Sequence, residues 1–120
     1  MNNKKLGTAW EKRYCEILKQ DGWWVHFISP DNRGAQPFDV IACKNGEPMA
    51  VDCKTTINPI FTMDRIEVNQ KLAFAKWYST GNKVVYIAIK WHDQYYEIPY
   101  TYLLKHGKVD LREWEGFDVQ

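Results

Sequence analysis

Residues 38–54 read FDVIACKNGEPMAVDCK, and this stretch decides the fold. Two runs of apolar and β-branched residues flank Asn45-Gly46. An Asn-Gly pair between such runs is the strongest short signal for a β-hairpin with a two-residue type I′ turn. With Lys44 opposite Glu47, each residue pairs with the one counted equally far from the turn. The hairpin is therefore expected to place Asp39 directly opposite Asp52.

Two carboxylates that face each other across strands repel, so this pair requires a cation or protonation of one member. A hard divalent cation held by oxygen ligands resolves the conflict. Because side chains alternate along a strand, Lys54 shares the face of Asp52, while Cys53 points to the other face. The competing interpretation is a surface hairpin with one salt bridge of little energetic value. We favour catalysis, because register, alternation and an acid on the first helix agree.

The segments around the hairpin alternate between helical and extended patterns. A first helix carries Trp10, Tyr14 and Leu18 on one face and ends near residue 20, before Asp21-Gly22. The later elements are expected to be strands 23–28, 38–43 and 49–54, a helix 64–78 whose inner face carries Ile66, Gln70, Ala73, Phe74 and Trp77, strands 83–90 and 95–99, and a short helix 101–106. This order α-β-β-β-α-β predicts an α/β fold with a central mixed β-sheet flanked by helices.

Glu11 precedes Tyr14 by three residues and Leu18 by seven, so it falls on or beside the apolar stripe of the first helix. An acid in that position requires a partner. On its own, Glu11 would be interpreted as a solvated acid paired with Lys4 or Lys12. Its association with Asp39 and Asp52 favours a place in the site.

Composition limits the possible classes of protein. With 120 residues, 45% of them hydrophobic, the chain is expected to form one domain, 1–120. No apolar run approaches a membrane span or a signal core, so we expect a cytoplasmic protein without a membrane partner. The three cysteines form no CxxC pair, which argues against a disulfide framework or a structural zinc site. The net charge of +1 gives no argument for or against DNA binding, although the first twenty residues are locally basic.

Glu11 on a leading helix, Asp39 on one strand and Asp52-Cys53-Lys54 on the next resemble the PD-(D/E)XK nuclease superfamily, and most closely its archaeal-type Holliday junction resolvases. The resemblance runs from about Gly7 to Trp91 and includes a Glu and a Gln, here Glu67 and Gln70, on the helix after the motif. The sequence departs from the signature where Phe38 separates Pro37 from Asp39, and where Asp52 replaces the Glu of many relatives.

The resemblance implies a restriction-endonuclease-like core and a magnesium-dependent endodeoxyribonuclease, with Mn²⁺ as a plausible substitute and no small-molecule cofactor. Asp39, Asp52 and the Cys53 carbonyl would bind the ion, and Glu11 would bind it directly or through water. Lys54 would orient the attacking water. The products would carry 5′-phosphate and 3′-hydroxyl ends. Two symmetric scissile phosphates imply a homodimer, for which Trp91, Tyr95, Tyr96 and Trp114 could supply the interface.

The resemblance also implies branched DNA as the partner, in recombination and repair. Phosphate contacts should come from basic side chains, giving affinity without sequence reading; the candidates are Lys4, Lys5, Lys12, Arg13 and Arg33, with Lys71 or Lys76 as further options. Ser29 could bind the scissile phosphate, but Ser29-Pro30-Asp31-Asn32 is also ordinary turn chemistry. Gln70 could touch the metal-site water or DNA, or cap a strand carbonyl, and these options are level.

Two other functions remain open on the sequence. One keeps the nuclease but makes it a restriction-like or repair enzyme that cuts duplex DNA. The other is a non-catalytic DNA-binding module with the same fold, against which the complete set of Glu11, Asp39, Asp52 and Lys54 argues. None of His26, His92 and His106 has metal-ligand spacing, so the histidines are left outside the expected site.

Overall fold

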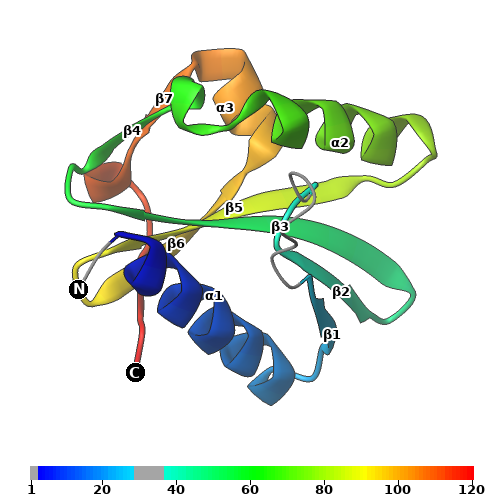
Figure 1. Cartoon of the computed structure of the whole chain (residues 1–120), viewed down its shortest axis with the longest axis horizontal. Coiled ribbons are helices and arrows are strands. Elements are labelled where there is room, and N and C mark those ends of the chain that lie inside the picture. The colour runs from blue at the N-terminus through cyan, green and yellow to red at the C-terminus, as the bar shows by residue number, and fades with distance from the viewer. Residues whose placement is uncertain (1–2, 29–36) are drawn as a thin grey trace.

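A central β-sheet separates one long helix from two shorter ones in this computed structural model (Figure 1). The structure describes residues 3–28 and 37–120, with residues 3–7 described by their backbone alone. Helix α1 (Asn3–Gln20) lies on one face of the sheet, and α2 (Val68–Ser79) and α3 (Tyr100–His106) lie on the other. No helix in these ranges is long and apolar enough to cross a membrane.

The main sheet has six strands in the order β1-β2-β3-β5-β6-β8. Its first three strands form an antiparallel meander, β3 and β5 are parallel, and β6 and β8 complete the sheet by antiparallel pairing. The α/β mixed sheet is therefore confirmed. The strands are β1 (Trp24–Phe27), β2 (Val40–Lys44), β3 (Glu47–Thr56), β5 (Val84–Trp91), β6 (Gln94–Pro99) and β8 (Phe117–Asp118).

The β2–β3 hairpin has the expected register. Lys44 pairs with Glu47, and the pairing continues without a slip to Val40 opposite Val51. Asn45 and Gly46 both have positive φ, 53° and 78°, as a type I′ turn requires. Asparagine and glycine tolerate this left-handed backbone better than other residues, so two residues of the turn fix which face every side chain of β3 occupies.

The two faces of β3 serve two separate cores. Val51 and Cys53 pack with Trp10, Tyr14 and Leu18 of α1, whereas Ala50 packs on the α2 face with Phe74. The indole Nε1 of Trp10 donates a hydrogen bond to the Ala88 carbonyl of β5 at 3.0 Å. This contact anchors the middle of α1 to the sheet and so fixes the position of Glu11, the next residue along the helix.

The start of the second helix differs from the prediction. Residues Met63–Arg65 form a 3-10 turn, and α2 begins only at Val68. Glu67 takes an extended conformation and caps the helix in a capping box with Gln70. These hydrogen bonds from backbone N–H groups to side chains set the start of the helix against the helical periodicity of the sequence, and so Ile66 is buried without being part of α2.

The sequence prediction also missed a small second sheet, in which β4 (Ile60–Thr62) pairs with β7 (Lys108–Asp110). Strands of three residues carry too little periodicity to detect. Helix α3 agrees with the expected short helix to within one residue and ends at Gly107, which has φ 76°. A second 3-10 turn (Leu111–Glu113) then leads to β8.

The expected aromatic dimer interface needs correction. Tyr95 and Tyr96 are 9% and 6% exposed, and the Tyr95 ring lies 5.5 Å from that of Trp10 within the same chain. These two residues therefore pack in the cores of their own chain and offer little surface to a partner.

Candidate active site

Asp39 lies where β2 leaves the regular ladder. The paired residues stop at Val40, so the predicted ladder pair of Asp39 with Asp52 does not form. The Asp39 N–H donates instead to the Val51 carbonyl at 3.1 Å. Its carboxylate Oδ2 accepts the N–H of Cys53 at 2.7 Å. The Asp39 side chain thus takes the place of a backbone acceptor, which holds a buried carboxylate beside the chain segment Asp52–Lys54.

Asp52 is completely buried, at 0% exposure. Its Oδ1 accepts a hydrogen bond from Gln70 Nε2 at 2.7 Å, and its Oδ2 lies 3.1 Å from Lys54 Nζ. Among the described residues no hydrogen-bond donor is aligned on Oδ2, despite this ion pair. Burial, and then the negative charge of Asp39, raise the pKa of Asp52 well above its usual range, while Lys54 opposes the shift. The positive charge near Asp52 is therefore too small to balance its carboxylate in this buried position.

Gln70 joins the other polar groups of the site. Besides holding Asp52, its Oε1 accepts hydrogen bonds from Lys54 Nζ at 3.2 Å and from the Glu67 N–H at 3.0 Å. Gln70 is 7% exposed, so its amide is shielded from bulk water. Gln70 therefore contacts the side chains of Asp52 and Lys54, and the capping that it provides is of the N-terminus of α2 and not of a strand carbonyl. Its contact with a metal-bound water or with DNA stays a prediction.

Glu11 approaches the same cluster from α1, on the opposite side of the sheet from α2. Burial raises its pKa from 4.5 to about 7; the charge of Asp39 adds to the shift and that of Lys54 counters it. Asp39 and Lys54 are thus the charged groups that interact electrostatically with Glu11. The structure brings together all five expected catalytic residues, Glu11, Asp39, Asp52, Lys54 and Gln70, in one electrostatically coupled group.

The donor set suits a hard divalent cation in its chemistry. The ligands on offer are carboxylate oxygens, which Mg²⁺ prefers, and Oδ2 of Asp52 is a buried anionic atom without an aligned donor. Within residues 8–28 and 37–120, however, no three acidic, histidine or cysteine side chains lie close enough together to form a ready-made metal centre. The fit is therefore one of charge and ligand type.

Of the six residues expected to contact DNA, Lys12 is solvent-exposed. The guanidinium of Arg13 is engaged within the chain, because its Nε donates to the Val119 carbonyl at 2.8 Å and its Nη1 lies 3.3 Å from Glu16. Arg13 thus ties α1 to the C-terminal segment. The side chains of Lys4 and Lys5, and all of Ser29 and Arg33, lie outside the described residues.

The structure adds residues that the sequence left out. A cavity of about 650 Å³ begins at Thr55, one residue beyond Lys54, and is lined by basic side chains that include Lys90 and His92. His92 occupies the turn between β5 and β6 with φ 57°. The signal that could have found it is the short gap, residues 91–94, between the two expected strands 83–90 and 95–99, which puts His92 in a turn at the end of the sheet.

Comparison with known protein families identifies the family of the chain. The profile of the archaeal Holliday junction resolvase (Hjc) family matches residues 2–118. The chain belongs to this family. The resolvase family is one of endonucleases with DNA as substrate, and the match covers every residue of the cluster around Asp52.

Solved structures show the same fold. The chain is similar to Hjc of Archaeoglobus fulgidus, a Holliday junction resolvase from an archaeal hyperthermophile, with a TM-score of 0.67, 14% identity and 92% of each chain covered. It is also similar to the bacterial homing endonuclease I-Ssp6803I, with a TM-score of 0.59, 17% identity, and coverage of 90% of this chain and 73% of the other. No curated protein sequence matches the chain significantly. The restriction-endonuclease-like fold is thereby confirmed.

Proposed function

We propose that this resolvase-family chain is a metal-dependent endonuclease that cleaves four-way (Holliday) junctions, giving 5′-phosphate and 3′-hydroxyl ends. The observation that carries the proposal is the buried Asp52 carboxylate, held by Gln70 and lying 3.1 Å from Lys54. Burial of this kind adds little stability to a salt bridge that is only structural. In an active site, by contrast, groups that are already fixed away from water stabilise the negative charge that develops in the transition state.

Each side chain has a task in this proposal. Asp39, Asp52, the Cys53 carbonyl and Glu11 would hold Mg²⁺, or Mn²⁺ in its place, through oxygen ligands. The raised pKa values of Glu11 and Asp52 support this, because the negative charge of these two carboxylates is under-compensated in the protein alone. The bound ion would supply positive charge to the pentacovalent state and to the departing 3′-oxygen. Lys54 orients the attacking water from its place beside Asp52. Gln70 fixes both Asp52 and Lys54 and thereby acts as a positioning residue.

The proposal extends to the assembly. Two scissile phosphates related by symmetry suit a homodimer with one site on each chain. Because Tyr95 and Tyr96 are buried inside the chain, the partly exposed Trp91 and Trp114 are the members of the expected aromatic set that could contribute to its interface. Sedimentation equilibrium of the purified protein tests this part, and a monomer that retains paired cleavage of junctions would contradict it.

A nuclease that cuts duplex DNA is the second candidate, because the fold is shared with the homing endonuclease I-Ssp6803I. The discriminating experiment presents the protein with a labelled four-way junction and with a linear duplex of the same sequence, each in Mg²⁺ and in EDTA. Paired symmetric nicks in the junction alone support the resolvase. Equal cutting of the duplex supports the second candidate.

Two variants make the experiment specific for the site. Asp52→Asn keeps the shape of the side chain and removes its charge, and it should abolish cleavage while leaving junction binding in place. Asp118→Asn changes an exposed aspartate on β8 in the same way and should cleave normally. Cleavage that survives in Asp52→Asn would overturn the site, and tight binding without cleavage by the unmodified protein would favour a non-catalytic module.

A further inference from the structure

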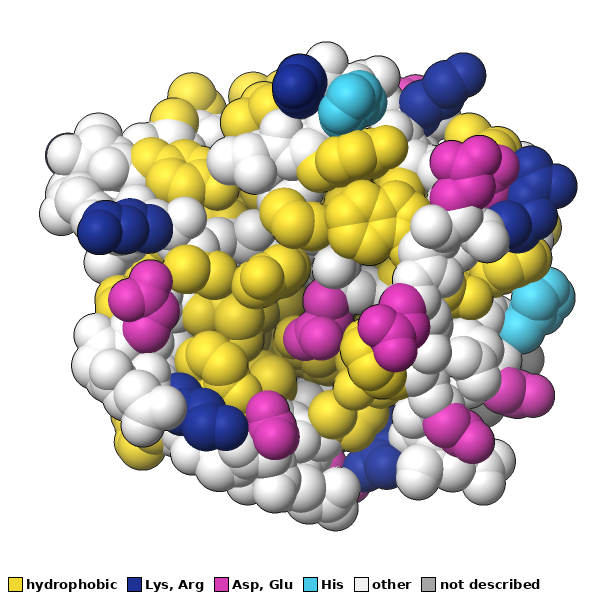
Figure 2. Space-filling view, turned by 180° about the vertical axis from the view of Figure 1, so that it is seen from behind, with side chains coloured by type: hydrophobic (Ala, Val, Ile, Leu, Met, Phe, Trp, Pro, Cys, Tyr) yellow, Lys and Arg dark blue, Asp and Glu magenta, His cyan; other side chains and the backbone are white. Residues whose placement is uncertain are grey.

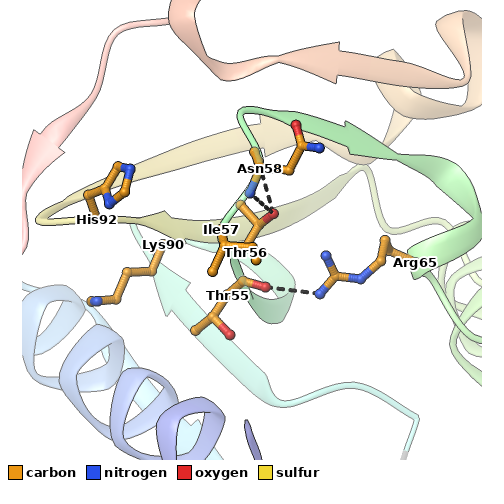
Figure 3. Close-up of a pocket in the computed structure, with 7 residues that line it drawn as sticks. All are labelled: Thr55, Thr56, Ile57, Asn58, Arg65, Lys90 and His92. Atoms are coloured by element: carbon orange, nitrogen blue, oxygen red, sulfur yellow. Dashed lines mark hydrogen bonds between the residues drawn. The ribbon is translucent and has the colours of Figure 1, made fainter.

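The cavity beyond Lys54 is a distinct feature of the surface and has no part in the site described above. Figure 3 shows Lys90 and His92 on one side of the segment Thr55–Asn58 and Arg65 on the other. We name it the basic hollow; it measures about 650 Å³ and is lined by Thr55, Thr56, Ile57, Asn58, Arg65, Lys90 and His92. Among these described lining residues none is acidic, so the hollow offers basic side chains, hydroxyl groups, one amide and one apolar side chain, and no negative charge.

Arg65 is fixed in place without losing its charge to an acid. Its Nη2 donates to the Thr55 carbonyl at 2.9 Å, and its guanidinium carbon lies 5.1 Å from the centre of the Phe61 ring. In the part of the chain that the structure describes, neither Arg65 nor Lys90 has a carboxylate partner. A guanidinium has five N–H donors in a rigid fork, so Arg65 keeps donors for an anion and is already oriented.

The turn at the edge of the basic hollow is rigid and displays an apolar side chain. Thr56 Oγ1 accepts the Asn58 N–H at 3.1 Å and donates to the Asn58 carbonyl at 2.9 Å, while Asn58 Oδ1 accepts the Ile60 N–H at 2.9 Å. Between them, Ile57 is 95% exposed. A single exposed isoleucine is unremarkable by itself. Held out on a hydrogen-bonded turn beside the cations Arg65 and Lys90, it resembles the apolar wedges that proteins insert between base steps.

The two ends of the sheet differ in charge. Leu18, Met49 and Val84 line a second hollow with the acidic residues Asp21, Glu47, Glu97 and Glu115, and Figure 2 shows hydrophobic side chains gathered there with acids around them. That end carries the beginnings of β3 and β5, whereas the basic hollow lies at their ends. A polyanion is therefore repelled at one end of the sheet and attracted at the other.

The spacing also suits a strand of DNA. Thr55 follows Asp52 by three residues on one strand, which is about 10 Å along β3. Phosphates on one DNA strand are spaced at about 3.4 Å along the helix axis. The basic hollow is thus within a few nucleotides of the phosphate that Asp52 and Lys54 would attack.

We propose that the basic hollow binds backbone phosphates of branched DNA next to the cleavage site, and that Ile57 packs against a base exposed where the arms separate. This inference rests on the proposed function, since it presupposes that DNA is the substrate. Arg65, Lys90 and His92 supply sequence-independent affinity, and Ile57 supplies the preference for a branch over a continuous duplex.

The test measures dissociation constants for a four-way junction and a matching duplex over a range of salt concentrations, in an Asp52→Asn background that prevents cleavage. Arg65→Gln and Lys90→Gln should each weaken binding to both DNAs by about 3- to 10-fold and lower the slope of log K against log salt by about one. Lys105→Gln, an exposed lysine on α3, is the matched control and should change neither quantity. Thermal melting of each variant verifies that it is folded.

Ile57→Ala should weaken junction binding about fivefold, leave duplex binding unchanged and leave the salt slope unaltered, because no charge is lost. Leu72→Ala, an exposed apolar residue on α2, is its control. Equal losses for junction and duplex, or no loss for either, would overturn the role of Ile57. If the unmodified protein cleaves junctions, but Arg65→Gln and Lys90→Gln both leave the DNA affinity and the salt slope unchanged, the phosphate site is overturned and the proposed function stands. If the unmodified protein neither binds nor cleaves a junction, the proposed function itself fails.

Discussion

Gln70 Nε2 donates to Oδ1 of Asp52 over 2.7 Å, and this bond joins the second helix to the centre of the sheet. The same amide accepts a hydrogen bond from Lys54, so the carboxylate and the ammonium are oriented by one side chain. Rotation of that amide would disturb both groups at once. Buried polar networks of this kind are rigid when every member has a partner.

Gln70→Leu should slow junction cleavage by about 10- to 100-fold, the usual cost of losing a group that orients a metal ligand. Junction affinity should change little, because Gln70 lies 7% exposed beneath the site. Single-turnover rates and binding curves separate the two effects, and Gln70→Glu should shift the pH profile of the rate. Gln20→Leu, at the exposed end of α1, is the control. Equal loss of binding and rate would indicate a direct contact with DNA instead.

Glu11 should make the metal-free protein less stable as pH rises. Its pKa is raised from 4.5 to about 7 in the folded state, so the folded protein holds the proton more tightly than the unfolded chain. Its stabilising effect is complete below pH 4.5 and is lost as pH rises to about 7. As pH rises from 4.5 to 8, the free energy of unfolding of Glu11→Gln should therefore increase by about 1 kcal/mol relative to that of the unmodified protein, after allowance for solvent screening. Urea unfolding in EDTA measures this gain, and parallel stability curves would contradict it.

Added Mg²⁺ should stabilise the folded protein at pH 8. A ligand present at 100 times its dissociation constant contributes about 2.7 kcal/mol when it binds the folded state alone. The gain should shrink at pH 5, where protons compete for Glu11 and Asp52. Thermal melting with and without Mg²⁺ tests this independently of cleavage. Asp52→Asn should abolish the gain and Asp118→Asn should keep it; an equal gain in Asp52→Asn would remove Asp52 from the metal ligands.

The hairpin could be predicted from the sequence because its determinants are local. Asn45-Gly46 sets the turn, and alternation then assigns each residue of β3 to a face, which brings Asp52 and Lys54 together. The departure of Asp39 from the ladder depends on a side chain replacing a backbone acceptor. No periodicity encodes that replacement, so the proximity of the two acids was predicted and its geometry was not.

The parts that escaped prediction depend on contacts distant in sequence. Strand β4 exists through its pairing with β7, almost fifty residues later, and three residues alone give no strand signal. The position of Glu67 outside α2 is a local exception, because its reciprocal bonds are with Gln70, three residues later. The basic hollow needs Arg65 and Lys90 on either side of the end of β3 (Figure 3), an arrangement that follows from the parallel crossover.

Trp10 should matter more to stability than any other tryptophan on the α1 face. Its indole is 2% exposed, donates to the Ala88 carbonyl at 3.0 Å and lies 5.5 Å from the rings of both Tyr14 and Tyr95. Trp10→Phe loses that hydrogen bond and leaves a void, which together should lower the free energy of unfolding by about 2 kcal/mol.

Trp24→Phe is the matched control, because Trp24 is 61% exposed on β1, and its effect should stay within about 0.5 kcal/mol. Urea unfolding monitored by circular dichroism measures both variants. Trp10→Phe should also slow cleavage at temperatures where it is still folded, since Glu11 is the next residue of the same helix and depends on the Trp10–Ala88 contact for its position. A destabilised variant with unchanged cleavage would show that Glu11 is held by the rest of α1, and equal destabilisation by the two substitutions would show that the Trp10 hydrogen bond does not anchor the helix.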